Sequence, residues 1–337
     1  MKLRTILIYI TVIAIVIIGV ACASFHYLFG GLEQDTAFRS QLNKLTQDLP
    51  ESESLSTLED SKIQNIAIFG IDSQSGNHGR SDATMIVSLD NEHNKIKIIS
   101  IARDSLVYIP QRDTREKLTH AYSYGGASLA VATINKNYNT NISDYVAVNF
   151  SEMAKIVDIV GGVEVDLSQE ECSVMGYSDL TPGTSVTLNG EQAVSYSRIR
   201  YIDSDIARAS RQREVLTSLF TKARAMKKAE YAALIKNCME LCTTSLDYKE
   251  LVSMAAILTN SDLTLEQFSC PSDLTTKTWG GIMDSGAWCW VYNTRAASKA
   301  ILQFIYEDLY DEATPKLPKA TVTTKILSSS EWSRNVN

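Results

Sequence analysis

An uncharged apolar segment near the N-terminus constrains this chain more than any other feature. Between Arg4 and Glu33 there is no formally charged residue when His26 is counted as neutral, and residues 6–28 are rich in Ile, Val and Ala. As a helix that rises 1.5 Å per residue, this segment spans ~30 Å, about the thickness of the hydrocarbon core of a bilayer. The sequence therefore predicts one transmembrane helix.

The charges that flank this segment predict its orientation. Lys2 and Arg4 precede it and Glu33 follows it, which favours a short cytoplasmic N-terminus and places nearly everything after Leu32 outside. A cleaved signal peptide is the alternative, because Ala21-Cys22-Ala23 has the small-x-small form of a cleavage site. We expect a retained anchor, because the apolar run continues past this site.

Six cysteines are present, and one of them, Cys22, lies in the apolar segment. The other five are Cys172, Cys238, Cys242, Cys270 and Cys289. Because five is an odd number, an exported domain keeps at least one thiol unpaired or pairs it with another chain. The spacing matches no metal motif, and one disulfide among the five is an open alternative.

The chain divides into four parts. Residues 1–32 form the cytoplasmic tail and anchor, and residues 33–62 form a polar stalk with a predicted helix over 36–48. Residues 63–313 alternate strand and helix patterns, and residues 314–337 form a Lys-rich, Ser-rich tail that we expect to be mobile. Strands interleaved with helices predict a single α/β domain outside the membrane, with a central mixed β-sheet covered by helices.

Hydrophobic periodicity predicts the individual elements. Strands are expected at residues 63–70, 84–89, 95–101 and 163–167, with a hairpin turn at 90–94. Helices are expected at residues 126–138, 150–160, 205–225, 231–242, 249–258 and 295–306.

Carboxylates and arginines gather at the ends of predicted strands. Asp72 follows a buried strand, where open α/β sheets bind ligands, and Gly70 permits close approach of the backbone. Arg80 and Asp82 lie two apart, so they share a face on extended backbone, and Arg103 follows the third strand. Mg²⁺ takes one or two carboxylates plus substrate phosphates, and a guanidinium group binds phosphate through two hydrogen bonds.

A basic block lies further along an otherwise acidic chain. The formal net charge is -7, yet five of the fourteen arginines fall between Arg198 and Arg213. Arg198 and Arg200 are expected on one face of a strand, whereas Arg208 and Gln212 have the i, i+4 spacing of one helix face. This distribution favours a local anion pocket over a nucleic-acid surface.

Taken singly, these side chains also fit an ordinary protein surface. An aspartate near a strand end is often a turn former, and surface ion pairs contribute little stability. Nearby carboxylates are available as partners: Asp203 for Arg200, Asp205 for Arg208 and Glu214 for Arg211. The joint order of the motifs therefore carries the functional interpretation.

That order resembles the LytR-CpsA-Psr family of cell-envelope proteins over residues 63–220, about half of the chain. The matching motifs are Gly70-Ile71-Asp72, Arg80-Ser81-Asp82-Ala83-Thr84, Ser100-Ile101-Ala102-Arg103-Asp104, His120-Ala121-Tyr122-Ser123-Tyr124-Gly125-Gly126, Asp144-Tyr145-Val146-Ala147-Val148-Asn149-Phe150, Gly161-Gly162-Val163 with Val165, Leu188-Asn189-Gly190-Glu191-Gln192-Ala193, Arg198-Ile199-Arg200, and Asp205 with Arg208, Arg211 and Gln212. Ala102 stands where the family usually has proline, and we recognise no motif beyond Phe220.

The resemblance implies a Mg²⁺-dependent phosphotransferase, with Mn²⁺ as the alternative metal. Such enzymes take an anionic glycopolymer, for example teichoic acid or capsule, from a polyprenyl-pyrophosphate carrier and transfer it to peptidoglycan as a phosphodiester. The implied partners are thus the lipid-linked glycopolymer, peptidoglycan and membrane lipid, without nucleic acid. The implied location is the cell membrane of a Gram-positive-type envelope, with a single-pass anchor.

The same resemblance implies roles for individual residues. Asp72 and Asp82 resemble the metal ligands. The residues that resemble the pyrophosphate binders are Arg80, Arg103, Arg198, Arg200, Arg208 and Gln212. The catalytic candidates are Arg80, Arg103 and Asp104, and Asp104 either orients Arg103 or accepts a proton from the acceptor hydroxyl. Phosphoryl transfer needs positioning and charge neutralisation more than a covalent catalyst, which is consistent with this set.

Two other functions use the same residues. A hydrolase would replace the glycan acceptor by water, and a non-catalytic binder would sense lipid-linked precursors and regulate envelope assembly. In each case the lipid needs an apolar channel. Apolar residues of the sheet and of the helices over 126–138 and 150–160 are candidates to line it, with ordinary core as the alternative.

Overall fold

The structure, a computed structural model, describes residues 34–47, 62–73, 79–112, 114–200, 202–203, 205–272, 279–283, 286–306 and 321–327. The predicted transmembrane segment and the alternative cleavage site lie outside these residues. Among the helices that are described, none is long and apolar enough to cross a membrane.

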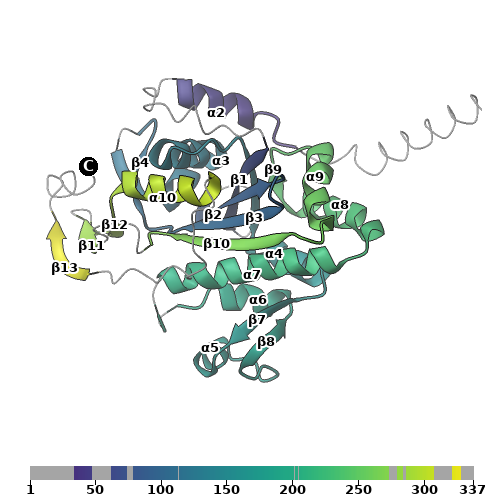
Figure 1. The fold of residues 1–337 in the computed structure, drawn as a ribbon. Coiled ribbons are helices and arrows are strands. Elements are labelled where there is room, and N and C mark those ends of the chain that lie inside the picture. The colour runs from purple at the N-terminus through teal and green to yellow at the C-terminus, as the bar shows by residue number, and fades with distance from the viewer. Residues whose placement is uncertain are drawn as a thin grey trace, which may run out of the picture.

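Six strands form the central sheet, in the order β10-β3-β2-β1-β6-β9 (Figure 1). Their bounds are β1 (Ile63–Asp72), β2 (Arg80–Asp90), β3 (Lys95–Ile101), β6 (Asp144–Asn149), β9 (Thr243–Thr244) and β10 (Thr264–Cys270). The strands β1, β2 and β3 are antiparallel neighbours, whereas β6 joins β1 and β10 joins β3 in parallel. The predicted mixed sheet and the hairpin turn at 90–94 are therefore confirmed.

Helices cover both faces of this sheet (Figure 1). One face carries α2 (Phe38–Gln47), α3 (Leu118–Tyr138) and α10 (Thr294–Tyr306). The other carries α4 (Phe150–Ile159), α7 (Asp205–Ala225), α8 (Tyr231–Leu241) and α9 (Tyr248–Ala255), with the short 3₁₀ helices η1 (Lys228–Glu230) and η2 (Ala256–Thr259). Alternate strand residues supply the two cores: Phe69 and Ile86 pack with the α3 layer, and Ile66 and Val87 with the α7 layer.

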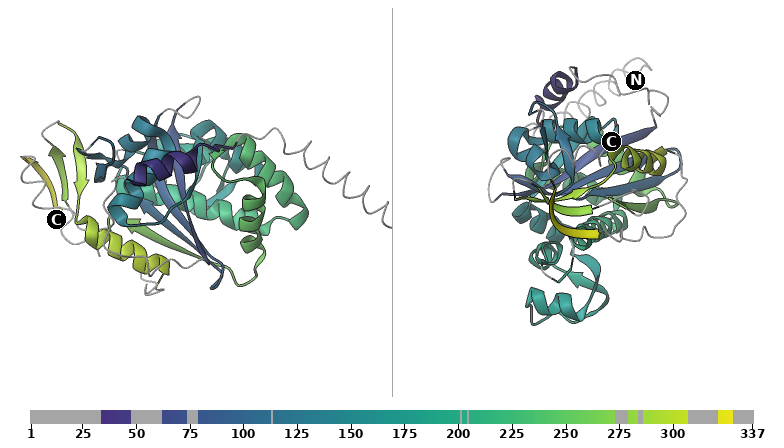
Figure 2. Two further views of the ribbon diagram at one scale, coloured as in Figure 1. Left: turned by 90° about the horizontal axis from the view of Figure 1, so that it is seen from above. Right: turned by 90° about the vertical axis from the view of Figure 1, so that its left-hand side faces the viewer.

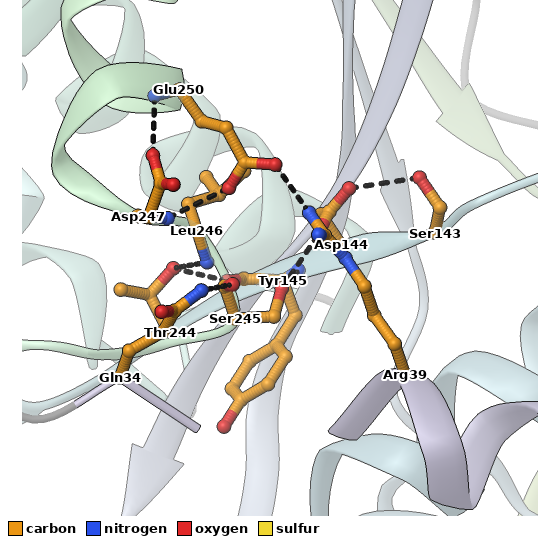
Figure 3. A network of polar contacts seen from close by, with 10 residues as sticks. All are labelled: Gln34, Arg39, Ser143, Asp144, Tyr145, Thr244, Ser245, Leu246, Asp247 and Glu250. Carbon is orange, nitrogen blue, oxygen red and sulfur yellow. Dashed lines mark hydrogen bonds and ion pairs between the residues drawn. The ribbon is translucent and has the colours of Figure 1, made fainter. Parts of the chain in front are cut away.

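Residues 34–47, predicted as part of a stalk, pack against the domain, and α2 lies across α3 (Figure 2). Phe38 is fully buried in the core. Arg39 donates to Glu250 at 2.6 Å and to Asp144 at 2.7 Å, which attaches α2 to α9 and to the start of β6 (Figure 3). The hydrogen bonds to these two carboxylates raise the pKa of Arg39. The globular part therefore includes α2.

Three smaller sheets flank the central one. They pair β4 (Leu106–Ile109) with β5 (Thr114–Lys117), β7 (Val163–Leu167) with β8 (Gly183–Leu188), and β11 (Trp279–Met283) with β12 (Trp288–Val291) and β13 (Thr321–Leu327). Two helices, α5 (Gln169–Met175) and α6 (Gly190–Ser197), accompany the β7–β8 pair. Because β13 pairs in parallel with β11, residues 321–327 of the predicted mobile tail belong to a sheet.

Most predicted elements are found within a few residues of their expected bounds, with two differences. The helix expected over 126–138 begins at Leu118 and bends at Gly125 and Gly126, where Gly126 has φ 61°. The strand expected at Arg198 and Arg200 is absent, because α6 runs to Ser197 and Arg198 is its C-cap. All five cysteines outside the N-terminal segment are free thiols, so the open disulfide alternative is not formed.

Candidate functional site

Asp82 lies at an irregularity in the pairing of β1 with β2. Gly70 pairs with Ala83 and Ile71 pairs with Ser81, so Asp82 is an extra residue on β2. Such a bulge redirects the side chain of the extra residue and is common beside functional sites. The strands are also close here, since a Cβ atom on Gly70 would lie 2.9 Å from the Cβ of Ala83. The predicted need for glycine at this position is therefore explained.

The bulged Asp82 brings two predicted phosphate-binding arginines together. Its Oδ1 accepts a hydrogen bond from Nη1 of Arg103 at 2.7 Å, and its Oδ2 lies 3.5 Å from Nη2 of Arg200. The Asp82 side chain is 6% exposed, whereas that of Arg200 is 43% exposed. The carboxylate thus offsets the repulsion between two guanidinium groups while Arg200 stays open to a ligand.

Asp104 is buried behind Arg103. Its Oδ2 lies 3.4 Å from Nε of Arg103, and its Oδ1 lies 2.8 Å from Nζ of Lys117. Both carboxylate oxygens therefore contact cations. Of the two roles expected for Asp104, this arrangement favours orienting Arg103 over accepting a proton.

Lys117 was not among the predicted site residues. It ends β5 directly before α3, and its ammonium group reaches Asp104 across the antiparallel β4–β5 pair. The sequence signal was its position just before the motif that begins at His120. Its contact with Asp104 depends on the fold and could not be read from spacing.

Backbone hydrogen bonds hold the segment that carries Arg103. The amide of Ala102 donates to the carbonyl of Cys270 at 2.8 Å, and the amide of Thr119 donates to the carbonyl of Arg103 at 3.0 Å. Proline at position 102 could not donate the first of these bonds. The departure from the family pattern at Ala102 therefore adds a contact between the Arg103 segment and β10.

Asp72 and Arg80 form the last pair of the β1–β2 ladder, and both are exposed. Directly paired residues share a face, and two-residue alternation along β1 puts Asp72 on the face of Ile66, toward the α7 layer. Regular alternation was expected to put Arg80 and Asp82 on one face. The bulge at Asp82 breaks that alternation, and the register pairs Arg80 with Asp72 instead.

Arg198 follows α6 and is exposed, and its guanidinium carbon lies 4.3 Å from the centre of the Phe150 ring. Arg198 and Arg200 therefore follow the end of a helix, and only Arg200 contacts Asp82, so the prediction of a shared strand face was wrong. The signal that favoured the helix is a capping box at its start, in which Asn189 and Gln192 bond to each other's backbone amides.

The remaining predicted residues lie on α7. Arg208 is 5% exposed, and Nε2 of Gln212 lies 3.5 Å from the carbonyl of Ser197 at the end of α6. Gln212 therefore joins α7 to the segment that carries Arg198 and Arg200, and Arg208 is buried one turn before it on the same helix. The alternative partner of Arg208, the side chain of Asp205, lies outside the described side chains.

Arg211 pairs with carboxylates that differ from the expected one. Its Nε donates to Glu171 at 2.7 Å, and its Nη2 contacts Asp203. Glu214, the partner considered from sequence, accepts instead from the hydroxyl of Tyr196 at 2.6 Å. Arg211 thus ties α5 to α7.

Asp72 and Asp82 fit a Mg²⁺ ion that arrives with phosphate. Among the described residues, no three His, Cys, Asp or Glu side chains gather as a metal site. Two carboxylates at one sheet edge are nevertheless the usual protein share of a Mg²⁺ site whose other ligands are phosphate oxygens and water. The donor set therefore suits a substrate-borne metal better than a permanently bound one.

An apolar cavity of about 270 Å³ lies between the sheet and α4, α7, α8 and α9. Apart from Thr244, the described residues that line it have hydrocarbon or sulfur side chains, among them Ile68, Val87, Leu219 and Met239, and none of these described residues is charged. The prediction that the helix over 150–160 lines a channel is consistent with this cavity, because Met153 of α4 contributes. The helix over 126–138 belongs to α3, on the opposite face, where its buried residues form part of the core, so for this helix the alternative of ordinary core applies.

Two structural elements, β1 and α7, each carry residues that line the cavity as well as polar candidate site residues. In β1, Ile68 lines the cavity and Asp72 follows four residues later, ~13 Å along the strand. In α7, Gln212 and the cavity residue Leu216 lie one turn apart. A long apolar chain held in the cavity would therefore end near the cluster of aspartates and arginines.

Comparison with known proteins is consistent with this arrangement. A family model described as the LytR_cpsA_psr family matches residues 31–303. The polyisoprenyl-teichoic acid–peptidoglycan teichoic acid transferase TagU of Enterococcus faecalis is 34% identical over 197 residues, which cover 57% of this chain and 64% of the relative. TagU of Bacillus cereus is 30% identical over 212 residues, which cover 62% of this chain and 69% of the relative.

Solved structures share the fold. Bacillus subtilis TagT is 25% identical, with a TM-score of 0.60, and the match covers 74% of this chain and 91% of TagT. The LytR-CPS2A-psr family protein YwtF (TagT) with bound octaprenyl pyrophosphate lipid is 24% identical, with a TM-score of 0.57, and the match covers 76% and 94% of the two chains. At this identity the second likeness concerns the fold alone.

Proposed function

The chain belongs to the LytR_cpsA_psr family, and from this premise we propose that it transfers an anionic glycopolymer from a polyprenyl-pyrophosphate carrier to peptidoglycan. The TagU relatives are named for the transfer of teichoic acid to peptidoglycan, and this chain spans 64% and 69% of two of them. The observation that carries the proposal is the apolar cavity that adjoins the cluster around Asp82.

The two halves of this site match the two halves of a lipid pyrophosphate. The cavity offers hydrocarbon walls without a charged side chain, which suits an isoprenoid chain. The cluster offers the guanidinium groups of Arg103 and Arg200 on either side of one carboxylate. Arginine binds phosphate oxygens in a planar, two-pronged geometry.

In the proposed reaction the acceptor hydroxyl attacks the phosphorus that carries the glycopolymer. A new P–O bond to the acceptor forms, the bond to the other phosphate of the carrier breaks, and polyprenyl phosphate leaves while the hydroxyl loses its proton. Arg103 and Arg200 neutralise the charge that develops on the leaving phosphate. Asp104 positions Arg103, since it contacts Nε on the side away from Asp82.

Asp72 and Asp82 are the residues that would hold Mg²⁺. When bound, the ion adds positive charge at the phosphate oxygens. Asp82 also contacts Arg103 and Arg200, so it couples the metal position to both arginines.

We further propose that residues 6–28 anchor the chain in the membrane, with the domain outside. Gln34 donates to the carbonyl of Ser245 at 2.6 Å and so lies on the domain. Gln34 lies six positions after Leu28, a stretch that at full extension spans ~20 Å. The domain would therefore lie close to the lipid that carries its substrate. Protease added to wall-stripped cells should digest the domain, and complete protection would contradict this topology.

The decisive experiment supplies the purified protein with Mg²⁺, a polyprenyl-pyrophosphate glycan and a peptidoglycan oligomer. We expect polyprenyl phosphate and a glycan joined to the oligomer through a phosphodiester. Release of polyprenyl phosphate at an equal rate without the oligomer would show a hydrolase. Saturable lipid binding without any product would show a non-catalytic binder.

A further inference from the structure

Arg115, in the strand β5, has an unusual environment for an arginine. It is partly buried, and its Nη1 atom is fully buried without a hydrogen-bond acceptor in the part of the chain that the structure describes. Burial lowers the pKa of Arg115, and no neighbouring carboxylate offsets that effect. A desolvated charge without a partner is unfavourable in a folded protein, so its presence calls for an explanation.

The charged neighbours Arg112, Glu116 and Lys117 do have partners, whereas Asp113 lies outside the described residues. Lys117 contacts Asp104 at 2.8 Å. The guanidinium carbon of Arg112 lies 4.0 Å from the centre of the Tyr124 ring, and its Nε lies 3.7 Å from Oε1 of Glu116. Arg115 therefore differs from these charged neighbours. A generally mobile surface would not explain its missing partner, because the neighbouring side chains are held in defined contacts.

The strand geometry places Arg115 beside the proposed active site. Alternate residues of a strand share a face, so Arg115 and Lys117 lie on one face of β5, with their Cα atoms ~6.6 Å apart. Lys117 contacts Asp104, Asp104 contacts Arg103, and Arg103 contacts Asp82. Arg115 thus extends this chain of charges by one further cation.

We propose that Arg115 binds an anionic group of the glycopolymer, a phosphate or carboxylate beyond the pyrophosphate of the donor. This inference rests on the proposed transferase function and adds a polymer subsite to it. Because the Arg115 side chain is only partly buried, the ligand would contact the part of it that solvent reaches.

The position of β5 favours the polymer as the ligand. A donor of this class is linear, with lipid at one end, pyrophosphate in the middle and polymer at the other end. The cavity lies under α8 and α9, whereas β4, the partner of β5, lies at the opposite end of the sheet (Figure 1). With the lipid in the cavity and the pyrophosphate at Arg103, the polymer therefore continues toward Arg115.

The proposal has a consequence for stability that a structural arginine would not show. Replacing Arg115 by glutamine removes a partly buried charge whose Nη1 has no hydrogen-bond partner among the described residues. The free variant should therefore melt at the same temperature as the wild type or higher. Binding of the anionic polymer should weaken in the same variant, because the charged donor is lost.

The test compares two polyprenyl-pyrophosphate donors that share one disaccharide, only one of which carries glycerol phosphate repeats. For Arg115→Gln we expect the KM of the repeat-bearing donor to rise about tenfold and that of the neutral donor to stay unchanged. Arg115→Lys should recover part of the loss. Calorimetry with a lipid-free glycerol phosphate oligomer should show the same weakening without any turnover.

Arg112→Gln is the matched control, since Arg112 is a nearby exposed cation, and it should leave both KM values unchanged. An equal rise for the two donors would place Arg115 at the pyrophosphate and overturn the proposal. A rise in the KM of the peptidoglycan acceptor alone, or a fall in melting temperature with unchanged KM values, would also overturn it. If the wild type processes neither donor, the transferase function fails, and the oligomer titration still decides about Arg115.

Discussion

The Oδ1 atom of Asp82 lies 2.7 Å from Nη1 of Arg103, so a carboxylate proposed to bind metal is already paired with an arginine proposed to bind phosphate. While the substrate is absent, the carboxylate of Asp82 offsets the positive charge of Arg103 through one oxygen and that of Arg200 through the other. An incoming pyrophosphate competes with Asp82 for these arginines, and a metal ion competes with the arginines for Asp82. The two ligands should therefore bind cooperatively.

Replacing Asp82 by asparagine tests this relationship. The variant loses a metal ligand and leaves two cations without a counter-charge, so transfer should fall at least about a hundredfold, an increase in barrier of ~2.7 kcal/mol. Without metal, inorganic pyrophosphate should raise the melting temperature of the variant more than that of the wild type, because the anion replaces the lost charge. Equal thermal shifts in the two proteins, or full activity in excess chelator, would contradict the assignment.

Arg200→Lys keeps the positive charge but loses the planar, two-pronged hydrogen bond. A charge-assisted hydrogen bond contributes roughly 1.5–3 kcal/mol, so transfer should slow about tenfold to a hundredfold if the bond is made mainly in the transition state. Arg198→Lys should have a similar effect and also lose the contact with Phe150. Single-turnover release of polyprenyl phosphate measures both losses.

The control for these variants is Arg295→Lys, on the exposed surface of α10. Arg213 lies off the i, i+4 helix face that Arg208 and Gln212 share, so from spacing alone a lysine at this position would be expected to be tolerated. In the structure Arg213 is buried against the sheet, donates to Gln267 at 3.3 Å and contacts Ser100, and burial lowers its pKa to about 10. Arg213→Lys should therefore lower the melting temperature, and equal loss of activity in Arg295→Lys would show that the assay reports general damage.

The strands at residues 95–101 and 163–167 were predictable from the sequence because hydrophobic pattern alone sets their bounds. The bulge at Asp82 was not, because register depends on pairing with β1. Burial of Arg213 was equally hidden, since its partner Ser100 lies 113 positions away. The motif order therefore supplied the candidate site residues, and long-range contacts decided how those residues are arranged.

Acid should weaken the contact between Glu171 and Arg211. Burial raises the pKa of Glu171, but hydrogen bonds from Arg211 and Ser168 outweigh it, so the net pKa is below the usual value. A carboxyl with a depressed pKa stabilises the fold fully above its unfolded pKa and loses that effect as the pH falls through the folded pKa. Glu171→Gln should therefore cost about 1 kcal/mol at pH 7 and progressively less as the pH falls through the folded pKa of Glu171.

Melting temperatures from pH 7 to pH 3 check this expectation, with Glu170→Gln as the control on the exposed side of the same helix. The wild-type and Glu171→Gln curves should converge at acid pH, whereas the control should follow the wild type throughout. A constant offset between wild type and Glu171→Gln at every pH would show that the glutamate acts through packing alone.

Filling the apolar cavity should separate lipid recognition from phosphate recognition. Ala223 lines the cavity from α7, whereas Ala225 on the same helix is exposed. A phenylalanine at position 223 occupies space proposed for the isoprenoid chain, so the KM of a long-chain donor should rise at least about tenfold. Because the ring buries apolar surface in an existing cavity, the melting temperature should stay level or rise.

Donors of two lipid lengths make this test specific. A short-chain, water-soluble polyprenyl-pyrophosphate glycan needs little of the cavity, so Ala223→Phe should process it nearly as well as the wild type does. Ala225→Phe adds the same ring outside the cavity and should leave both donors unaffected. If Ala223→Phe handles the long-chain donor normally while its fold is intact, the lipid must bind elsewhere, and the match between the cavity and the Asp82 cluster loses its functional meaning.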